Sequence, residues 1–314
     1  MRSPTLRELP DPPRGKKGWP WTEESPQLPE VMPGDQPWLK ISIVTPSYNQ
    51  GRFIEETIRS VLLQGYPDFQ YIIIDGGSVD GSVDIIKKYA KWLDYWVSEP
   101  DRGQSHAINK GFKIASGDIY AWLNSDDYLL KDALRNVAVA YYAAPKAGAW
   151  VGGCLRVDMN GKVLWTSWPN RLEVDAVADW LKNNYSQSAC FFSKEAWQTC
   201  GPLEEDLYYA MDLDLWIKIA KTFSITKVGR LLSADHVHKG AKTQKDKARM
   251  YTEIFSVQIR HGYERFAMEY IRQWVNAYVD LQRKLGRISR IPFVRPILPV
   301  ARICWKVLSY LIIA

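Results

Sequence analysis

Between residues 40 and 130, short apolar runs alternate with stretches of helical periodicity, and this alternation restricts the chain to a small set of folds. The apolar runs cover residues 41–45, 71–74, 95–98 and 118–123. The run 71–74 contains no charged residue, which is typical of a parallel strand that is covered on both faces. Residues 53–63, 83–92 and 104–115 have the periodicity of helices. The pattern predicts a doubly wound, mostly parallel α/β sheet.

A cluster of polar residues follows each predicted strand. These clusters lie at residues 46–51, 75–78, 99–103 and 124–127. Ligands of doubly wound sheets bind beyond the carboxyl ends of the strands. We therefore expect the four loops to form one ligand site.

Two adjacent acids, Asp126 and Asp127, close the last of these runs. Like charges at one strand end repel each other, so a compensating cation is expected, and Mg²⁺ and Mn²⁺ prefer carboxylate oxygen. The same pair also fits a turn or helix N-cap before Tyr128, because Asp is favoured there. Taken alone, the pair leaves both interpretations open.

The two ends of the chain differ from its middle. Residues 1–38 hold nine of the 18 prolines and show no apolar periodicity, so we expect a disordered lead-in. No apolar run follows the N-terminal Met-Arg, and no stretch of about 18 uncharged apolar residues is present. The sequence therefore predicts a cytoplasmic protein, whose four scattered cysteines are reduced and structural.

Residues 39–244 form the predicted α/β domain, and residues 245–314 a basic helical extension. From residue 239 onward, fifteen Lys or Arg stand against five Asp or Glu. Apolar residues and arginines alternate from residue 287, which favours a segment lying on the cytoplasmic face of a membrane. Docking of this segment on the domain, or on a second subunit, is the alternative.

Within the domain the pattern becomes less regular after residue 145. Residues 149–157 and 162–166 flank the turn signal Asn160-Gly161 and predict an antiparallel hairpin. A strand is expected at 188–192, a helix at 209–220, and helical structure from 245 to about 285.

An ordered set of motifs resembles the inverting family-2 glycosyltransferases. The set comprises Thr45-Pro46-Ser47-Tyr48-Asn49, the segment 74–82 with Asp75-Gly76-Gly77-Ser78, the segment 98–103 with Glu99-Pro100-Asp101, Asn109-Lys110-Gly111, Asn124-Ser125-Asp126-Asp127, and Met211-Asp212-Leu213-Asp214-Leu215-Trp216. It covers roughly residues 40 to 240, and a whole ordered set is more specific than one short motif. The resemblance implies a GT-A fold with a Rossmann-like sheet, a nucleotide-diphosphate sugar donor and a divalent cation, Mn²⁺ or Mg²⁺.

The resemblance also implies roles for individual residues. Pro46, Ser47, Asp75 and Lys110 match the donor-binding positions, although Asp75 also fits a turn acid at a strand end. Asp126 and Asp127 match the family's D-x-D element, with Asp127 on the metal and Asp126 near the donor.

Later motifs supply the remaining implied roles. Asp212 matches the general base, and Asp214 is a possible substitute. His238 fits a second metal ligand or a contact to the diphosphate, and Lys242 fits a neutralising partner of the diphosphate. Gln187 and Ser188 match the acceptor side, where Trp165, Trp168 and Trp180 are candidates for stacking on a sugar. His106 stands where many relatives carry an acid.

The implied function is a metal-dependent, inverting glycosyltransferase that acts on a glycan or a lipid-linked acceptor. A nucleotidyltransferase-like enzyme is one alternative, but the loop at residues 46–49 lacks the Gly-rich, basic character of a phosphate loop. A non-catalytic nucleotide-sugar or glycan-binding module is the other. No nucleic-acid motif accompanies the basic C-terminal region.

Overall fold

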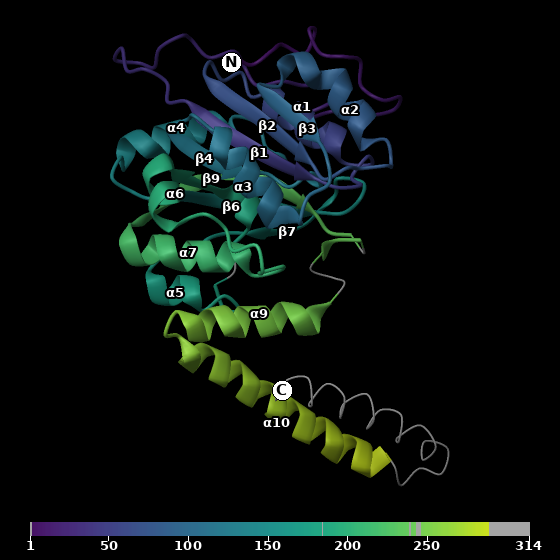
Figure 1. Cartoon of the computed structure of the whole chain (residues 1–314), viewed down its shortest axis with the longest axis vertical. Coiled ribbons are helices and arrows are strands. Elements are labelled where there is room, and N and C mark those ends of the chain that lie inside the picture. The colour runs from purple at the N-terminus through teal and green to yellow at the C-terminus, as the bar shows by residue number, and fades with distance from the viewer. Residues whose placement is uncertain (1, 184, 239, 243–245, 289–314) are drawn as a thin grey trace. The chain divides into compact units, whose positions relative to one another are not determined.

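The computed structural model describes residues 2–183, 185–238, 240–242 and 246–288 (Figure 1). By its internal contacts the chain divides into two units, with the boundary between Lys247 and Ala248. Of the basic, apolar segment expected from residue 287, residues 289–314 lie outside the described residues.

The first unit is built on a nine-stranded mixed sheet with helices packed against it (Figure 1). Its strands are β1 (Ile41–Ser47), β2 (Phe69–Asp75), β3 (Tyr95–Ser98), β4 (Ile119–Trp122), β5 (Asp127–Leu129), β6 (Ala149–Val157), β7 (Val163–Ser167), β8 (Cys190–Ser193) and β9 (Ile225–His236). They are arranged in the order β3-β2-β1-β4-β8-β6-β9-β5, and β7 pairs with β6.

The helices of this unit connect and cover the strands. They are α1 (Ile54–Leu62), α2 (Ser82–Tyr89), α3 (Gln104–Ile114), α4 (Ala133–Ala143), α5 (Val174–Ala178), α6 (Lys194–Cys200) and α7 (Met211–Thr222), with short 3-10 turns η1 (Ala90–Trp92) and η2 (Gln187–Ala189). Helix α3 packs closely on β1, because a Cβ atom on Gly111 would lie 2.4 Å from Val44.

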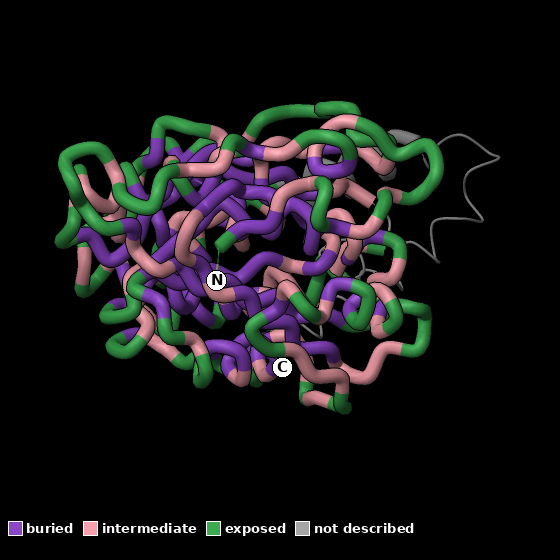
Figure 2. The backbone as a smooth tube through the Cα atoms, turned by 90° about the horizontal axis from the view of Figure 1, so that it is seen from above, coloured by how far each residue is buried: buried purple, intermediate pink, exposed green. Residues whose placement is uncertain are grey.

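Half of the sheet is the predicted parallel α/β arrangement. Strands β3, β2, β1 and β4 are parallel neighbours. Strand β8 then runs antiparallel to β4 and to β6, and β5 runs antiparallel to β9. The central strands are buried, as the purple stretches of Figure 2 show, and exposed residues gather in the outer loops. Continuous burial explains why the strands β1, β2 and β4 read as uninterrupted apolar runs.

The structure corrects the expectation for residues 1–38. The segment from Arg2 to Trp38 is not a disordered lead-in, because Leu9, Trp21 and Trp38 are buried in the domain. Its main chain bonds to the turn after α1: Ser25 N–H donates to the Leu63 carbonyl (2.9 Å). The predicted disorder followed from proline content, but these large apolar side chains provide enough burial to order the segment.

Two other expectations change in detail. The strand expected at 188–192 begins at Cys190, because Gln187–Ala189 form the turn η2. Strand β9 was not expected, and it carries Asp235 into the region described below. The cysteines Cys154, Cys190 and Cys200 are free and buried.

The described part of the second unit is a pair of helices, α9 (Lys247–Arg260) and α10 (Glu264–Ile288). One long helical region was expected, but the chain breaks at Gly262, whose φ is +82°. Aromatic contacts hold the pair together: Trp274 of α10 lies 4.7 Å from Tyr251 and 5.6 Å from Phe255 of α9, between ring centroids.

Candidate active site

The predicted donor loops meet at the carboxyl ends of the parallel strands. The register places Ser47 beside Asp75 and Asp75 beside Ser98, so the ends of β1, β2 and β3 are aligned. Pro46 and Ser47 are buried at the end of β1. The structure therefore brings Pro46, Ser47 and Asp75 together, as expected.

Asp75 is the centre of a dense hydrogen-bond network. Its fully buried carboxylate accepts from the hydroxyls of Ser47 (2.9 Å), Ser78 (2.5 Å) and Ser98 (2.7 Å). It also accepts from the backbone N–H groups of Gly77 (3.1 Å) and Ser78 (2.8 Å). A carboxylate has roughly four lone-pair sites, so these five donors leave Asp75 no acceptor position for a further partner. Asp75 thus fixes the loop at residues 76–78 and holds it against β1 and β3.

Lys110 lies on α3, next to the loop that follows β3. Its ammonium group forms an ion pair with Glu99. His106, also on α3, accepts a hydrogen bond from the Arg102 backbone N–H through Nδ1 (3.4 Å).

The two acids of the Asp126-Asp127 pair face different surroundings. Nε2 of His238 lies 3.2 Å from Oδ2 of Asp126, and the Asp126 side chain is 21% exposed. Nδ1 of His236 donates to the Asp126 carbonyl (2.8 Å). Asp127 is buried and accepts from Nδ2 of Asn124 (3.1 Å).

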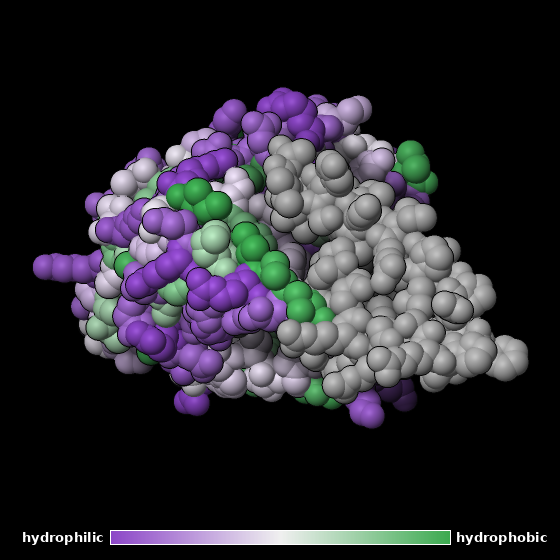
Figure 3. All heavy atoms as spheres, turned by 90° about the horizontal axis from the view of Figure 1, so that it is seen from below, coloured by the Kyte–Doolittle hydropathy of each residue, from purple (hydrophilic) through white to green (hydrophobic). Residues whose placement is uncertain are grey.

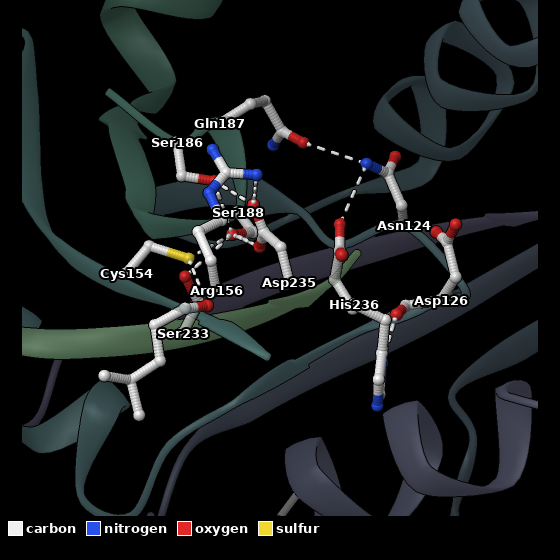
Figure 4. Close-up of polar contacts among 12 residues, drawn as sticks. Asn124, Asp126, Cys154, Arg156, Ser186, Gln187, Ser188, Ser233, Asp235 and His236 are labelled. Carbon is white, nitrogen blue, oxygen red and sulfur yellow. Dashed lines mark hydrogen bonds and ion pairs between the residues drawn. The ribbon is translucent and has the colours of Figure 1, made fainter. Parts of the chain in front are cut away.

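Asp127 lies beside another buried acid, Asp235 of β9. Burial raises the pKa of the Asp127 carboxyl well above its usual range, and the charges of Asp235 and Asp126 raise it further. Asp235 is compensated instead by Arg156, whose Nη1 is 2.8 Å from its Oδ2. The hydroxyls of Ser186 and Ser188 also donate to Asp235 (Figure 4). Asp127 therefore belongs to a buried network, and Asp126 remains the accessible acid.

This arrangement decides how a metal would fit. The expected partners Asp127 and His238 are not paired, since His238 contacts Asp126. Neighbouring ligand atoms of an octahedral ion with bonds of about 2.1 Å are about 3.0 Å apart. The 3.2 Å between Asp126 and His238 suits two such positions.

The protein provides few ligands at this place. Among the described residues, no group of three or more His, Cys, Asp or Glu side chains converges on a common point. Mg²⁺-type sites commonly take only one or two carboxylates and fill the other positions with water and substrate phosphates. The residues present therefore fit a cation that binds together with a diphosphate.

A chain of polar contacts links the acids to the loop after β9. Gln104 of α3 donates to Oδ1 of Asn124 (2.6 Å), and Lys242 donates to Oε1 of Gln104 (2.8 Å). The ammonium group of Lys242 also lies 3.9 Å from the ring centroid of Tyr208, just before α7. Lys242 thus lies between the acids and the start of α7.

Asp212, the predicted base, is in the first turn of α7. Burial raises its pKa to about 6, while a 2.7 Å hydrogen bond from the Leu213 N–H and the charge of Lys242 act in the opposite direction. A carboxylate with a pKa near neutrality is a stronger base than an ordinary Asp. Asp214 does not offer this chemistry, because it is buried and 2.7 Å from Nζ of Lys218.

The two residues expected on the acceptor side, Gln187 and Ser188, differ in exposure. Gln187 is partly exposed, donates to the Trp122 carbonyl (2.8 Å) and accepts from Nδ2 of Asn124 (3.4 Å). Ser188 is 3% exposed and bonds to Asp235, so it supports the buried network and does not face an acceptor. Trp180 is partly buried.

A lateral row of residues runs from the acids to the sheet edge. Asp127, Asp235, Arg156 and Trp165 are successive partners across β5, β9, β6 and β7. Directly paired residues point to the same face of a sheet. Trp165 ends the row and is 53% exposed, whereas Trp168 lies against Gly153.

Arg156, His236 and Asp235 were missed as site residues. Asp235 and His236 belong to β9, and Arg156 follows an apolar run in β6. The signal in the sequence is the alternation of polar Ser233 and Asp235 with apolar Leu232 and Ala234, which is typical of a strand but does not indicate a site.

The family model described as glycosyl transferase family 2 matches residues 42–200. The putative teichuronic acid biosynthesis glycosyltransferase TuaG of Bacillus subtilis (strain 168) is 41% identical over 99 residues, which is 30% of this chain and 39% of that protein. An uncharacterized glycosyltransferase of Rickettsia bellii (strain RML369-C) is 26% identical over 81% of this chain and 38% of its own length. The match thus spans less than two fifths of these relatives' lengths.

Solved structures give the same picture of the fold. Mannosyltransferase PcManGT from Pyrobaculum calidifontis, in complex with GDP-Man and Mn²⁺, has a TM-score of 0.57 at 19% identity, covering 88% of both chains. TarS 1-349 of S. aureus, in complex with UDP-GlcNAc, has a TM-score of 0.55 at 17% identity, covering 70% of this chain and 66% of that one. These likenesses confirm the expected GT-A fold. Because the family model covers half of the sequence, this chain belongs to glycosyl transferase family 2.

Proposed function

We propose that the protein transfers a sugar, of hexosyl type, from a nucleotide-diphosphate donor to a hydroxyl group of a glycan or lipid-linked acceptor, with inversion and with the help of a divalent cation. The observation that carries the proposal is the separation of two acidic groups. Asp126, paired with His238, is suited to a cation, and Asp212, with a pKa of about 6, is suited to proton removal. Direct displacement at a sugar carbon needs both tasks.

Asp126 and His238 are the proposed metal ligands, in place of the Asp127 expected from the sequence. A bound Mn²⁺ or Mg²⁺ would stabilise the charge that develops on the departing diphosphate. The solved mannosyltransferase relative contains Mn²⁺ together with GDP-Man, which supports this assignment. Asp127, with its raised pKa, would instead stabilise the loop from within.

Asp212 would accept the proton of the acceptor hydroxyl as its oxygen attacks the sugar. The burial that raises its pKa makes it a better proton acceptor at neutral pH. A single displacement of this kind inverts the sugar carbon. Lys242 lies close enough to lower the pKa of Asp212, and so would help to keep it ionised before the reaction.

Pro46, Ser47, Asp75 and Lys110 are the proposed donor-side residues. Because Asp75 already accepts from five donors, its proposed role is to shape the loop that contacts the nucleotide. Lys110 is paired with Glu99 and would have to exchange this partner for a phosphate.

Relatives named for teichuronic acid synthesis and for poly(ribitol-phosphate) glycosylation support a polysaccharide acceptor. Gln187 is the proposed acceptor contact near the acids. Trp165, at the exposed end of the lateral row, offers an aromatic face to a sugar further along the acceptor.

We also propose that the second unit binds a membrane surface at the cytoplasmic face. No helix in the described part of the chain is both long and apolar enough to span a bilayer. Helix α10, however, exposes Met268 (53%), Val275 (52%) and Val279 (40%). Their spacing of seven and four residues places them on one helix face, and Figure 3 shows apolar side chains exposed among polar ones. Such a face suits the boundary between headgroups and acyl chains.

A panel of nucleotide sugars tests the enzymatic proposal. Purified protein is incubated with each donor in Mn²⁺ or Mg²⁺, and release of the nucleoside diphosphate is measured. We expect metal-dependent release from one donor or a few, and its loss in Asp126→Asn. The control Asp206→Asn, at an exposed position between α6 and α7, should behave as wild type. If no donor is bound or cleaved by folded protein, the proposal is wrong; binding without cleavage or transfer would indicate a binding module.

A further inference from the structure

Helix α1 contacts the acidic loop, residues 124–127, through one hydroxyl group. Oγ1 of Thr57 lies 3.0 Å from the Ser125 carbonyl and 2.6 Å from the Asp127 carbonyl. These carbonyls belong to the residues on either side of Asp126. Thr57 is buried, so water cannot replace it. Its hydroxyl therefore holds the backbone of Asp126 at both ends.

A second hydroxyl of α1 holds the strand that follows. The backbone N–H of Leu129 donates to Oγ of Ser60 (3.0 Å). His236 donates to the Asp126 carbonyl, and the one Thr57 hydroxyl proton is shared between the carbonyls of Ser125 and Asp127. The direction of the Asp126 side chain toward His238 thus depends on the position of α1.

The N-terminal segment, residues 2–38, fastens α1 in this position. The guanidinium group of Arg59, completely buried on α1, donates to the carbonyls of Pro10 (2.8 Å), Pro20 (3.1 Å) and Trp21 (2.9 Å). Its carbon Cζ lies 5.6 Å from the Trp21 ring centroid. Three carbonyls of the segment are thereby fixed to one side chain of the helix.

The same segment also contacts the acidic loop's strand directly. Nε1 of Trp19 donates to the Leu129 carbonyl (2.7 Å). Oγ of Ser25 accepts from the Asp132 N–H (3.0 Å), and Glu23 pairs with Lys131. The segment therefore contacts the end of β5 directly, in addition to its contacts with α1.

We propose that the N-terminal segment is a positioning element of the donor site, which sets the Asp126 loop through Arg59, Thr57 and Trp19. The family match begins at residue 42, so the segment is an addition to the region that defines the family. The proposal rests on the proposed function, because it assigns the segment to the site that would hold the cation and the diphosphate. Hydrogen-bond partners of metal ligands tune affinity without touching the metal.

Thr57→Val tests the hydroxyl, with Thr57→Ser as the rescuing variant. Binding of UDP and of GDP is measured by calorimetry with and without Mn²⁺, and amide hydrogen exchange is measured for residues 123–130 in the free protein. We expect Thr57→Val to weaken Mn²⁺-dependent binding about tenfold or more and to speed exchange in this loop, and Thr57→Ser to restore both. Unchanged affinity and exchange in a folded Thr57→Val protein would overturn the proposal.

Trp19→Phe and Arg59→Met test the segment itself. Trp19→Phe removes one N–H donor and keeps an aromatic ring, so it is expected to fold even if Arg59→Met does not. We expect both to speed loop exchange and weaken Mn²⁺-dependent nucleotide binding, while Arg14→Met, which changes an exposed side chain of the same segment, leaves both unchanged. Faster exchange within the segment alone, with normal nucleotide affinity, would show a purely structural role and contradict the proposal. Wild-type protein that binds neither these two nor any other nucleoside diphosphate in the presence of Mn²⁺ would instead contradict the proposed function.

Discussion

At the scale of single residues, neighbouring acids have separate environments. Asp126 and Asp127 are adjacent, yet one is partly exposed beside His238 and the other is buried beside Asp235. Asp126 lies in a turn, in which the Asp127 N–H donates to the Asn124 carbonyl (3.1 Å), whereas Asp127 begins strand β5. A sequence shows that two acids are adjacent, but it does not show which of them faces inward. The family resemblance implies a metal on Asp127, whereas the structure leaves Asp126 as the more exposed of the two acids.

The raised pKa of Asp212 implies that the stability of the fold depends on pH. Its folded-state pKa of about 6 lies above the ordinary value of 3.8, so the folded state binds the proton more tightly than the unfolded state. The favourable contribution of this group is complete below about pH 4 and is lost as the pH rises through about 6. Asp212→Asn has no such charge to bury.

We therefore expect Asp212→Asn to be more stable than wild type at pH 7, by as much as about 3 kcal/mol. The difference should shrink toward pH 4. Urea unfolding of both proteins across this range measures it. Equal stability at pH 7 would mean that Asp212 is solvated and lacks the raised pKa.

At the scale of elements, strands that are buried along their length were predicted from the sequence, and a partly exposed strand was not. Strands β1, β2 and β4 are buried along nearly their whole length and were recognised as apolar runs. Strand β9 was missed, because its first half is largely exposed and its buried half contains Ser233 and Asp235. These polar residues are stable inside because Arg156 pairs with Asp235 and Ser188 of η2 bonds to both Ser233 and Asp235. Such partners come from distant parts of the chain and cannot be read from a local pattern.

Helix α10 gives a prediction at the same scale. Val275→Glu places a charge in the middle of its exposed apolar face, so it should weaken binding to vesicles that contain anionic lipid. Co-sedimentation with phosphatidylglycerol vesicles measures the effect. Gln273→Glu, an equally charged change at another exposed position of α10, is the control. Equal loss in both variants would indicate simple charge repulsion, and no loss in either would remove α10 from the proposed membrane contact.

At the scale of the whole molecule, the chain combines a family domain with an addition at each end. The parallel half of the sheet aligns the donor loops, and the antiparallel half brings β9 and α7 to the same region. The order and type of the central elements were predictable because each strand end carries its own motif. The packing of residues 2–38 was not predictable, because their proline content is typical of disorder. The side chain that binds three of their carbonyls, Arg59, lies on another element, α1.

The measurement that tests the central claim most directly compares sugar transfer and donor binding in Asp212→Asn. The variant keeps the shape of the side chain and its hydrogen bond from Leu213, but cannot accept a proton from the acceptor. With a donor found in the nucleotide-sugar panel and a polysaccharide acceptor, we expect donor affinity in Mn²⁺ close to that of wild type and a transfer rate lowered by about 10² to 10⁴-fold. Asp206→Asn should match wild type in both. Transfer by Asp212→Asn at the wild-type rate would contradict the account, because proton removal would then belong to another group.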